Sequence, residues 1–382
     1  MKIGILTQPL HANYGGLLQN FALQQVLRDA GHEVTTLDWD WVFNLSTKEK
    51  IGNLIRKLMC ALKPAKKIND AYHPTKEEFS IIWRNTNRFI DTYIRRTDVI
   101  TSEQGFAQEY EQGGYEAMVV GSDQCWRPCY NSFLSSMFLN FAKGDIKRVS
   151  YAASFGSDSW EFTIEQTREA RNLVKRFDLV TVREDGGVDL CKRYLDIDAI
   201  QVLDPTLLLD KTVYENIAKK CNTPKSKGNL FTYILDPNEK KSQIVENIES
   251  ASGLIHFDVL PICQSEVRTK DDIKNRIEDC VYPGVEVWLQ AFMDAKMTIV
   301  DSFHGMVFSI IFNKPFWVIG NKERGLNRFT SLLKYFNLED RLLYGNEVDN
   351  LDLLKPINWH EVNIKLSEGR RYSKQILLNA LD

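Results

Sequence analysis

The sequence predicts an α/β protein built from two doubly wound domains that face each other across a cleft. In both halves of the 382-residue chain, short apolar runs typical of buried strands alternate with longer amphipathic segments. This alternation is the pattern of parallel sheets with crossover helices. A polar segment with Pro and Gly at 221–229 separates the two series, and the length suits two domains. We therefore expect domains over residues 1–220 and 221–355, followed by a C-terminal helix over 356–382.

The chain opens with a β-loop-α-β pattern. A strand-like run, Lys2–Thr7, precedes the loop QPLHANYGG, a helical pattern over Leu17–Ala30 and a second strand over Glu33–Leu37. The end of the loop, Asn13–Gly16, carries two glycines, which let the backbone approach a ligand closely just ahead of a helix. This loop lacks the GxGxxG spacing of dinucleotide-binding sites. A plain tight turn is the alternative to a ligand-binding loop.

A basic amphipathic stretch follows at residues 48–67. Its apolar side chains recur at helical spacing and seven lysines and arginines surround them. A surface helix packed on the domain is the simpler interpretation, and a helix that leans on an anionic membrane surface is the other. A further amphipathic helix is expected over Phe79–Ile94.

Three later strands of the N-terminal domain end in polar residues at one predicted sheet edge. The first strand, Ala117–Val120, is followed by GSDQCW. The second, Leu179–Val182, is followed by Arg183, Glu184 and Asp185, and the third, Ile200–Leu203, by Asp204 and Pro205. Another strand, Val149–Ser154, lies between the first two in the chain. Asp123, Gln124 and Trp126 offer hydrogen bonds and a flat apolar face to a ligand, although a structural turn with a packed Trp126 fits equally. Asp204 before Pro205 favours a turn former over a catalytic group.

The second series starts at Leu230 and centres on VDSFHGMVFSII. A buried strand over Met297–Val300 ends where a helical run, Met306–Phe312, begins. His304 lies between them, so it is placed to transfer protons beside an anion bound at the helix N-terminus. A helix-capping histidine without chemistry is the alternative. The other expected elements are strands over 230–235, 254–259 and 316–319 and helices over 239–251, 286–295, 327–336 and 359–381.

Composition excludes several classes of protein. The net charge is −3 with both signs throughout, so a general nucleic-acid surface is not expected. The N-terminus lacks a signal-peptide core, and no stretch approaches the roughly 20 apolar residues of a membrane span. Seven scattered cysteines form no CxxC pair, which indicates a reduced, cytoplasmic protein without a structural metal.

Taken together, several stretches resemble the polysaccharide pyruvyl transferase family. They occur in the family's order over nearly the whole chain and read NYGGLLQNFALQQVL, VVGSDQCW, VSYAASFG, TVRED, VLDPTLLL, VDSFHG, FNKPF and LNRFTSLL. The resemblance implies a GT-B-like fold with two Rossmann-like domains. It implies transfer of pyruvate from phosphoenolpyruvate, a co-substrate, to two hydroxyls of a sugar as a ketal in surface or capsular polysaccharide synthesis, with release of phosphate and no cofactor.

The resemblance also assigns roles to residues. His304 matches the family's catalytic histidine, and Arg183 matches an arginine that holds the donor, although a surface salt bridge with its acidic neighbours is the alternative. The family often has an arginine where this chain has Ser302, and Arg324, Arg328 or Lys322 could replace it. The full donor set is Arg183, Ser302, Phe303, Gly305, Arg324 and Arg328. The acceptor set is Asn13, Tyr14, Gly15, Gly16, Gln19, Asp123, Gln124 and Trp126.

The chemistry fits these residue types. A planar guanidinium pairs the carboxylate or phosphate of the donor bidentately, and histidine titrates near neutrality, as proton delivery to the enol carbon requires. The acceptor is expected to be a sugar or a lipid-linked oligosaccharide, with peripheral membrane contact through 48–67. Two other functions stay open: a glycosyltransferase that uses a nucleotide sugar, and a non-catalytic sugar-binding relative.

Overall fold

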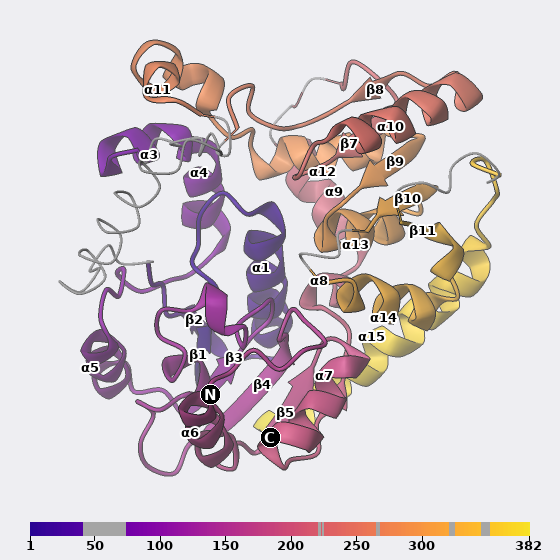
Figure 1. Ribbon diagram of the computed structural model, residues 1–382. Helices are drawn as coiled ribbons and strands as arrows, with labels where there is room; N and C mark the ends of the chain where they lie inside the picture. Colours follow the sequence, from indigo (N-terminus) through magenta and orange to yellow (C-terminus); the bar gives the residue numbers. More distant parts are fainter. Residues whose placement is uncertain (41–73, 221–222, 224, 265–267, 321–324, 345–351) are drawn as a thin grey trace, which may run out of the picture.

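The computed structural model describes residues 1–40, 74–220, 223, 225–264, 268–320, 325–344 and 352–382. The predicted basic helix over 48–67 and the candidate residues Lys322 and Arg324 lie outside the described residues. The chain forms two parallel sheets, each covered by helices, which make two Rossmann-like domains facing each other in a GT-B-like arrangement (Figure 1). The predicted fold class is confirmed.

The N-terminal sheet has six strands in the order β2-β1-β3-β4-β5-β6, all parallel. They are β1 (Lys2–Leu6), β2 (Glu33–Thr36), β3 (Ala117–Val120), β4 (Lys147–Ala153), β5 (Leu179–Val182) and β6 (Ile200–Gln201). The helices of this half are α1 (Tyr14–Asp29), α3 (Lys76–Ile82), α4 (Arg84–Tyr93), α5 (Glu103–Gly113), α6 (Ile164–Val174), α7 (Asp185–Leu190) and α8 (Pro205–Leu208). β3 is buried along its whole length, as expected for a strand covered on both faces.

The C-terminal sheet has five parallel strands in the order β11-β10-β9-β7-β8. They are β7 (Leu230–Tyr233), β8 (His256–Phe257), β9 (Met297–Val300), β10 (Phe316–Ile319) and β11 (Leu342–Leu343). The helices are α9 (Lys211–Lys220), α10 (Glu239–Ser252), α11 (Lys270–Arg276), α12 (Val285–Asp294), α13 (Phe303–Ile311), α14 (Asn327–Phe336) and α15 (Trp359–Leu381).

The strand order reverses once in each sheet. In the N-terminal sheet β1 lies between β2 and β3, and in the C-terminal sheet β7 lies between β8 and β9. Ligands of open α/β sheets bind at such switch points, outside the carboxyl ends of the strands. The loops after β1, β3, β7 and β9 are therefore where the topology alone places a site.

Two helices pack across the predicted domain division. α9, which the prediction assigns to the N-terminal domain, packs on α12 of the C-terminal half. α15 crosses back to the N-terminal half, where Ser373 Oγ accepts a hydrogen bond from Leu203 N–H at 3.0 Å and Arg370 Nε donates to Leu207 O at 2.9 Å. Amphipathic patterning shows that such helices have an apolar face but not which sheet covers it, and the domain division stays a prediction.

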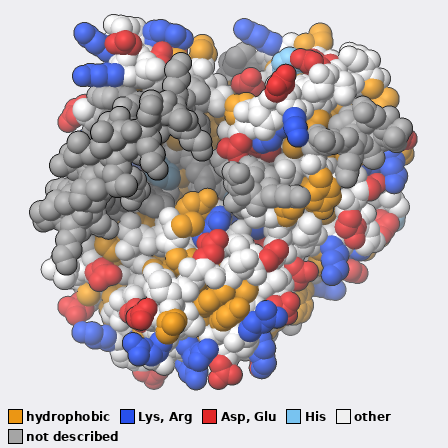
Figure 2. Space-filling model, viewed as in Figure 1, with side chains coloured by type: hydrophobic (Ala, Val, Ile, Leu, Met, Phe, Trp, Pro, Cys, Tyr) orange, Lys and Arg blue, Asp and Glu red, His pale blue; other side chains and the backbone are white. Residues whose placement is uncertain are grey.

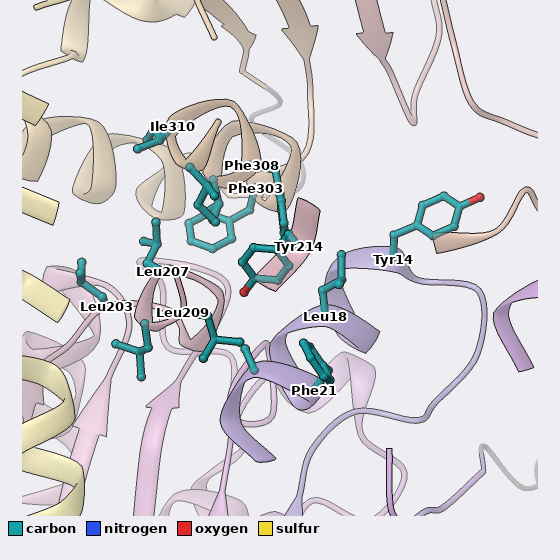
Figure 3. Packing of buried hydrophobic residues seen from close by; sticks show 14 of the residues in the cluster. Tyr14, Leu18, Phe21, Leu203, Leu207, Leu209, Tyr214, Phe303, Phe308 and Ile310 are labelled. Carbon is teal, nitrogen blue, oxygen red and sulfur yellow. The ribbon is translucent and has the colours of Figure 1, made fainter. Parts of the chain in front are cut away.

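One apolar cluster joins the two domains. Figure 3 shows side chains of α1, α8, α9 and α13 meeting, with Phe303 and Phe308 above Leu207 and beside Tyr214. Tyr14 stacks on Trp288 of α12 with ring centroids 5.6 Å apart, and its hydroxyl donates to Pro283 O at 2.8 Å. Tyr14 is completely buried, so its predicted acceptor role is replaced by a contact that holds the domains together.

The structure also corrects three predicted helix and strand boundaries. The helix expected over Phe79–Ile94 is two helices, α3 and α4, which meet at Trp83; the ring of Trp83 stacks on Phe79 and contacts His11. The strand expected over 254–259 is only two residues long. α13 begins at Phe303 rather than after Gly305, since Ser302 caps it.

The described surface carries mixed charge. On the face shown in Figure 2, acidic and basic side chains are interspersed outside the grey area. Among the helices that the structure describes, we find none that combines the length and the apolar character needed to span a bilayer.

Candidate functional site

A cavity of about 110 Å³ lies where the two switch points face each other. It is lined by residues from the loops after β1, β3, β7 and β9 and from α14: Asn13, Gly15, Asp123, Gln124, Tyr130, Tyr233, Leu235, Asp301, Ser302, Phe303, His304 and Arg328. Eight of these belong to the predicted donor, acceptor and catalytic sets, namely Asn13, Gly15, Asp123, Gln124, Ser302, Phe303, His304 and Arg328. The structure therefore brings together residues that lie up to three hundred positions apart in the chain.

His304 is the second residue of α13. Ser302 Oγ caps the helix by accepting a hydrogen bond from Gly305 N–H at 3.0 Å, which fixes the first turn. The imidazole is only 8 % exposed. Its Nε2 lies 3.5 Å from Asp204 Oδ2, whereas its Nδ1 lies over Gly15, where an added Cβ would come within 2.1 Å of it. Gly15 is thus required for the close approach of the ring.

Asp204 uses its two carboxylate oxygens for different purposes. Oδ1 accepts from the backbone N–H of Thr206 at 3.0 Å and from its hydroxyl at 2.6 Å, which starts α8. Oδ2 accepts from Ser122 Oγ at 3.1 Å and from Arg183 Nη1 at 3.0 Å, and it faces His304. Burial opposes ionisation, but His304, Arg183 and the Thr206 hydrogen bond together hold the pKa of Asp204 well below its usual range. The predicted turn-forming role is present, and a second role toward His304, which the sequence reasoning ranked lower, lies beside it.

Arg183 is enclosed by carboxylates. Its Nε donates to Glu184 at 3.0 Å, its Nη1 to Asp204 at 3.0 Å, and its Nη2 lies 3.5 Å from Asp123. The side chain is 2 % exposed, and the ring of Phe303 covers the guanidinium at 4.1 Å. Burial disfavours the charged form, but Glu184, Asp123 and Asp204 outweigh it and raise the pKa of Arg183 above its ordinary value.

This geometry does not agree with a direct donor contact by Arg183. All three guanidinium nitrogens are engaged by carboxylates, so in this arrangement Arg183 holds three acidic side chains together. It is not the surface salt bridge that the sequence allowed either, because Glu184 and Asp204 are as buried as the arginine.

Arg328 of α14 is the cation that lines the cavity itself. Burial and the charge of Arg183 lower the pKa of Arg328 to about 10, which leaves the guanidinium charged at neutral pH. A second cavity of about 90 Å³ lies on the other side of Phe303, and Arg183 and Arg328 line it as well. A cation at this place was among the predicted replacements for the family arginine at Ser302.

Two predicted acceptor residues are buried in the N-terminal domain. Trp126 is completely buried, its indole N–H donates to Met137 O at 2.9 Å, and its ring stacks on Phe138. It offers no face to a sugar, so its role is packing. Gln19 is also completely buried: its amide donates to Thr7 Oγ1 and accepts from Ser122 N–H, both at 3.0 Å. It positions the loop after β3 and does not reach the cavity.

The remaining predicted residues lie at the cavity edge. Asn13 caps α1 by accepting from Gly16 N–H at 3.1 Å, so Gly16 serves the cap rather than the cavity lining. Gly305 plays the same part in α13. Gln124 and Asp123 line the wall.

Asp301 is a site residue that the sequence reasoning did not select. Its carboxylate accepts the backbone N–H groups of Leu235 at 2.7 Å and Asp236 at 3.0 Å, and it pairs with Lys241 Nζ at 2.6 Å. It thereby ties the loop after β7 to the start of α13. An acidic residue directly after a buried strand was the available signal.

Within the described residues, no group of three or more His, Cys, Asp or Glu side chains is arranged to hold a metal ion. The carboxylates nearest the cavity are instead paired with Arg183 and Lys241. The absence of a cofactor stays a prediction.

Comparisons with known proteins place the chain. Similar solved structures include the UDP-GlcNAc 2-epimerase of Methanocaldococcus jannaschii, with 12 % identity, a TM-score of 0.48, and coverage of 96 % of this chain and 92 % of that one. The Neisseria meningitidis UDP-GlcNAc 2-epimerase bound to UDP-GlcNAc has 9 % identity, a TM-score of 0.46, and coverage of 98 % and 94 %. Acinetobacter baumannii MurG has 8 % identity, a TM-score of 0.46, and coverage of 100 % and 99 %. No curated protein matches the sequence significantly. Residues 13–323, which contain every described residue of the cavity except Arg328, match the polysaccharide pyruvyl transferase family. The chain belongs to the polysaccharide pyruvyl transferase family.

Proposed function

We propose that the protein transfers the enolpyruvyl unit of phosphoenolpyruvate to two hydroxyls of one sugar, which forms a cyclic pyruvate ketal and releases phosphate. The observation that carries the proposal is the cavity at the facing switch points, in which His304, Arg328 and the N-terminus of α13 meet. A proton-transferring group, a guanidinium and a helix N-terminus are the parts that a small, doubly anionic enol ester requires.

The donor would be held by charge. Phosphoenolpyruvate carries a carboxylate and a phosphate, and the positive end of α13 and the Arg328 fork suit these two groups. Since Arg183 is occupied by carboxylates, Arg328 takes the place in our proposal that the family resemblance gave to two arginines.

The reaction follows from a proton on His304. The imidazolium gives this proton to the methylene carbon of the enol, and the central carbon becomes electrophilic. One sugar hydroxyl adds to that carbon and loses its proton to the imidazole. The carbon–oxygen bond to phosphate breaks, the second hydroxyl adds to the same carbon and gives its proton to the departing phosphate, and the ring closes. The products are the ketal and phosphate.

The acceptor side would be the wall formed by Asn13, Asp123, Gln124 and Tyr130. Amide, carboxylate and phenol groups are the hydrogen-bonding types that sugars use. The proposal includes the identity of the sugar, its lipid carrier and a role in capsule synthesis. A panel of acceptors would test them.

The decisive experiment is a phosphate-release assay. The protein is incubated with phosphoenolpyruvate and a panel of galactose- and mannose-type acceptors, and the product is checked for a ketal by mass spectrometry. We expect acceptor-dependent phosphate release that falls about 10²–10⁴-fold in His304→Ala, the usual loss for a general acid. Release of nucleotide from a nucleotide sugar, with none of phosphate from phosphoenolpyruvate, would assign the protein to glycosyl transfer. A His304→Ala variant that keeps more than half of the wild-type turnover would remove the histidine from the mechanism.

A further inference from the structure

The imidazole of His304 and the carboxylate of Asp204 come from different domains. His304 is the second residue of α13 in the C-terminal domain, and Asp204 follows β6 and caps α8 in the N-terminal domain. Their nearest atoms, Nε2 and Oδ2, are 3.5 Å apart. We propose that Asp204 is the positioning residue that keeps His304 in its proton-carrying form, so that the acid of the reaction is assembled only where the two domains meet. The inference rests on the proposed function for its catalytic meaning, but the contact can be tested without it.

Asp204 is held rigidly on its own side of the interface. Thr206 satisfies one carboxylate oxygen, and Ser122 and Arg183 donate to the other. The side chain has no exposed surface. The carboxylate therefore has a fixed direction, and the position of its remaining contact, His304, depends on how the C-terminal domain is seated.

The two ring nitrogens of His304 face different groups. Nε2 faces Asp204, while Nδ1 lies over Gly15, which lines the cavity. A carboxylate that accepts from one ring nitrogen fixes the tautomer and orientation and leaves the other nitrogen for the substrate. A contact of 3.5 Å is longer than a well-formed hydrogen bond, and catalytic contacts of this kind shorten once the substrate is bound.

Charged and titratable groups surround this pair on several elements. They are Asp123, Arg183, Glu184, Asp204, Asp301 and Arg328, with the phenols of Tyr130 and Tyr233 on the cavity wall. The single charge of Arg183 faces three carboxylates, and Lys241 neutralises Asp301. Arg328 is the opposing cation. Among these groups Asp204 is the carboxylate in contact with the imidazole.

The assembly couples proton transfer to the seating of the domains. The contact exists only while the two domains are seated against each other, because its two atoms belong to different domains.

The first test is a titration of the imidazole by NMR. The protein has six histidines, so selective ¹⁵N-histidine labelling with His304→Gln identifies the signal of His304. In Asp204→Asn, which keeps an oxygen for Thr206 and removes the charge, we expect the titration midpoint of that signal to move about 1–3 pH units lower, the usual effect of removing an adjacent opposite charge. An unchanged midpoint in a folded Asp204→Asn protein would overturn the proposal.

The pH profile of turnover gives an independent measurement. If His304 acts as the imidazolium, activity falls as the pH rises through its titration midpoint. Asp204→Asn should therefore move the alkaline limb of the kcat profile to lower pH by the same amount as the NMR midpoint. A variant that lowers kcat equally at every pH would show a structural role only and would overturn the proposal. If no acceptor supports phosphate release at all, the proposed function fails while the NMR result still decides the contact.

A measurement that leaves Asp204 in place covers the case in which Asp204→Asn does not fold. With ¹³C-labelled aspartate, the carboxyl signal of Asp204 should follow the titration of His304 through the neutral range, and this step should vanish in His304→Gln. A carboxyl signal that stays constant between pH 5 and 9 in the wild-type protein would refute the contact.

Discussion

A methyl group at Gly15 should stop turnover while leaving the protein folded. In Gly15→Ala the added Cβ would lie 2.1 Å from Nδ1, 2.3 Å from Cγ and 2.6 Å from Cβ of His304. Heavy atoms in contact prefer about 3.5–4.0 Å, so the imidazole must move by more than about 1 Å. A displacement of 1 Å in a catalytic group can cost about 10²-fold in rate. We expect kcat to fall about 100-fold or more.

The stability of Gly15→Ala should change much less. Gly15 lies in the first turn of α1, where alanine gains up to about 1 kcal/mol in helix propensity, against about 1–3 kcal/mol for overpacking. We expect the free energy of unfolding, measured with urea, to change by less than about 2 kcal/mol.

Gly16→Ala is the matched control on the same helix. Its added Cβ would meet the end of the Asn13 side chain at 3.0 Å, and its three nearest heavy atoms all belong to Asn13. We expect less than a 10-fold loss of kcat. If Gly15→Ala retains as much activity as Gly16→Ala, the close approach of His304 to α1 is not needed for turnover, and the reasoning is refuted.

Two further predictions separate the arginines. Arg183→Ala leaves Asp123, Glu184 and Asp204 buried without their cation, so we expect a loss of about 3–5 kcal/mol in the free energy of unfolding at pH 7. The pKa of Asp204 is lower in the folded protein than in the unfolded chain, where it is about 4, so this group stabilises the fold above that pH. The contribution is lost as the pH falls through the folded pKa, and the difference between Arg183→Ala and wild type should therefore shrink when urea unfolding is measured in acid. A loss below about 1 kcal/mol at pH 7 would contradict the prediction. Arg328→Ala should raise the KM for phosphoenolpyruvate at least 10-fold with little change in the acceptor KM, and Arg328→Lys should recover only part because it lacks the planar fork. Lys334→Ala, at an exposed position of the same helix, is the control. If the KM of Arg328→Ala for phosphoenolpyruvate lies within twofold of the KM of Lys334→Ala, Arg328 is excluded from donor binding.

The sequence was sufficient for the parts of the site that follow from strand ends. Strand-like runs at Ala117–Val120 and Met297–Val300 agree with β3 and β9, and polar residues directly after them line the cavity. This succeeds because the carboxyl ends of parallel strands lie at one edge of a sheet whatever the rest of the fold does. His304 was found for the same reason.

The parts that depend on contacts between the domains could not be derived from the sequence. Tyr14 and Phe303 were assigned to substrates, yet Tyr14 packs on Trp288 and Phe303 covers Arg183. Aromatic side chains beside glycines suit a ligand site and a packed interface equally. Asp204 was ranked as a turn former because its local signal, a following proline, is visible in the sequence, whereas its distance to His304 depends on how two sheets face each other.

Ser302, at the position where the family resemblance implies an arginine, has a structural role. Ser302 is the N-cap of α13, and exchanging a serine cap for a residue that cannot cap costs about 0.5–2 kcal/mol of helix stability. An arginine at this position would also enter the cavity beside Arg328, where burial already opposes charge and Arg183 adds a like charge. A second guanidinium at this place would therefore be repelled by Arg328. Ser302 and Arg328 have separate tasks: the serine secures the helix whose N-terminus faces the cavity, and α14 supplies the cation that lines it.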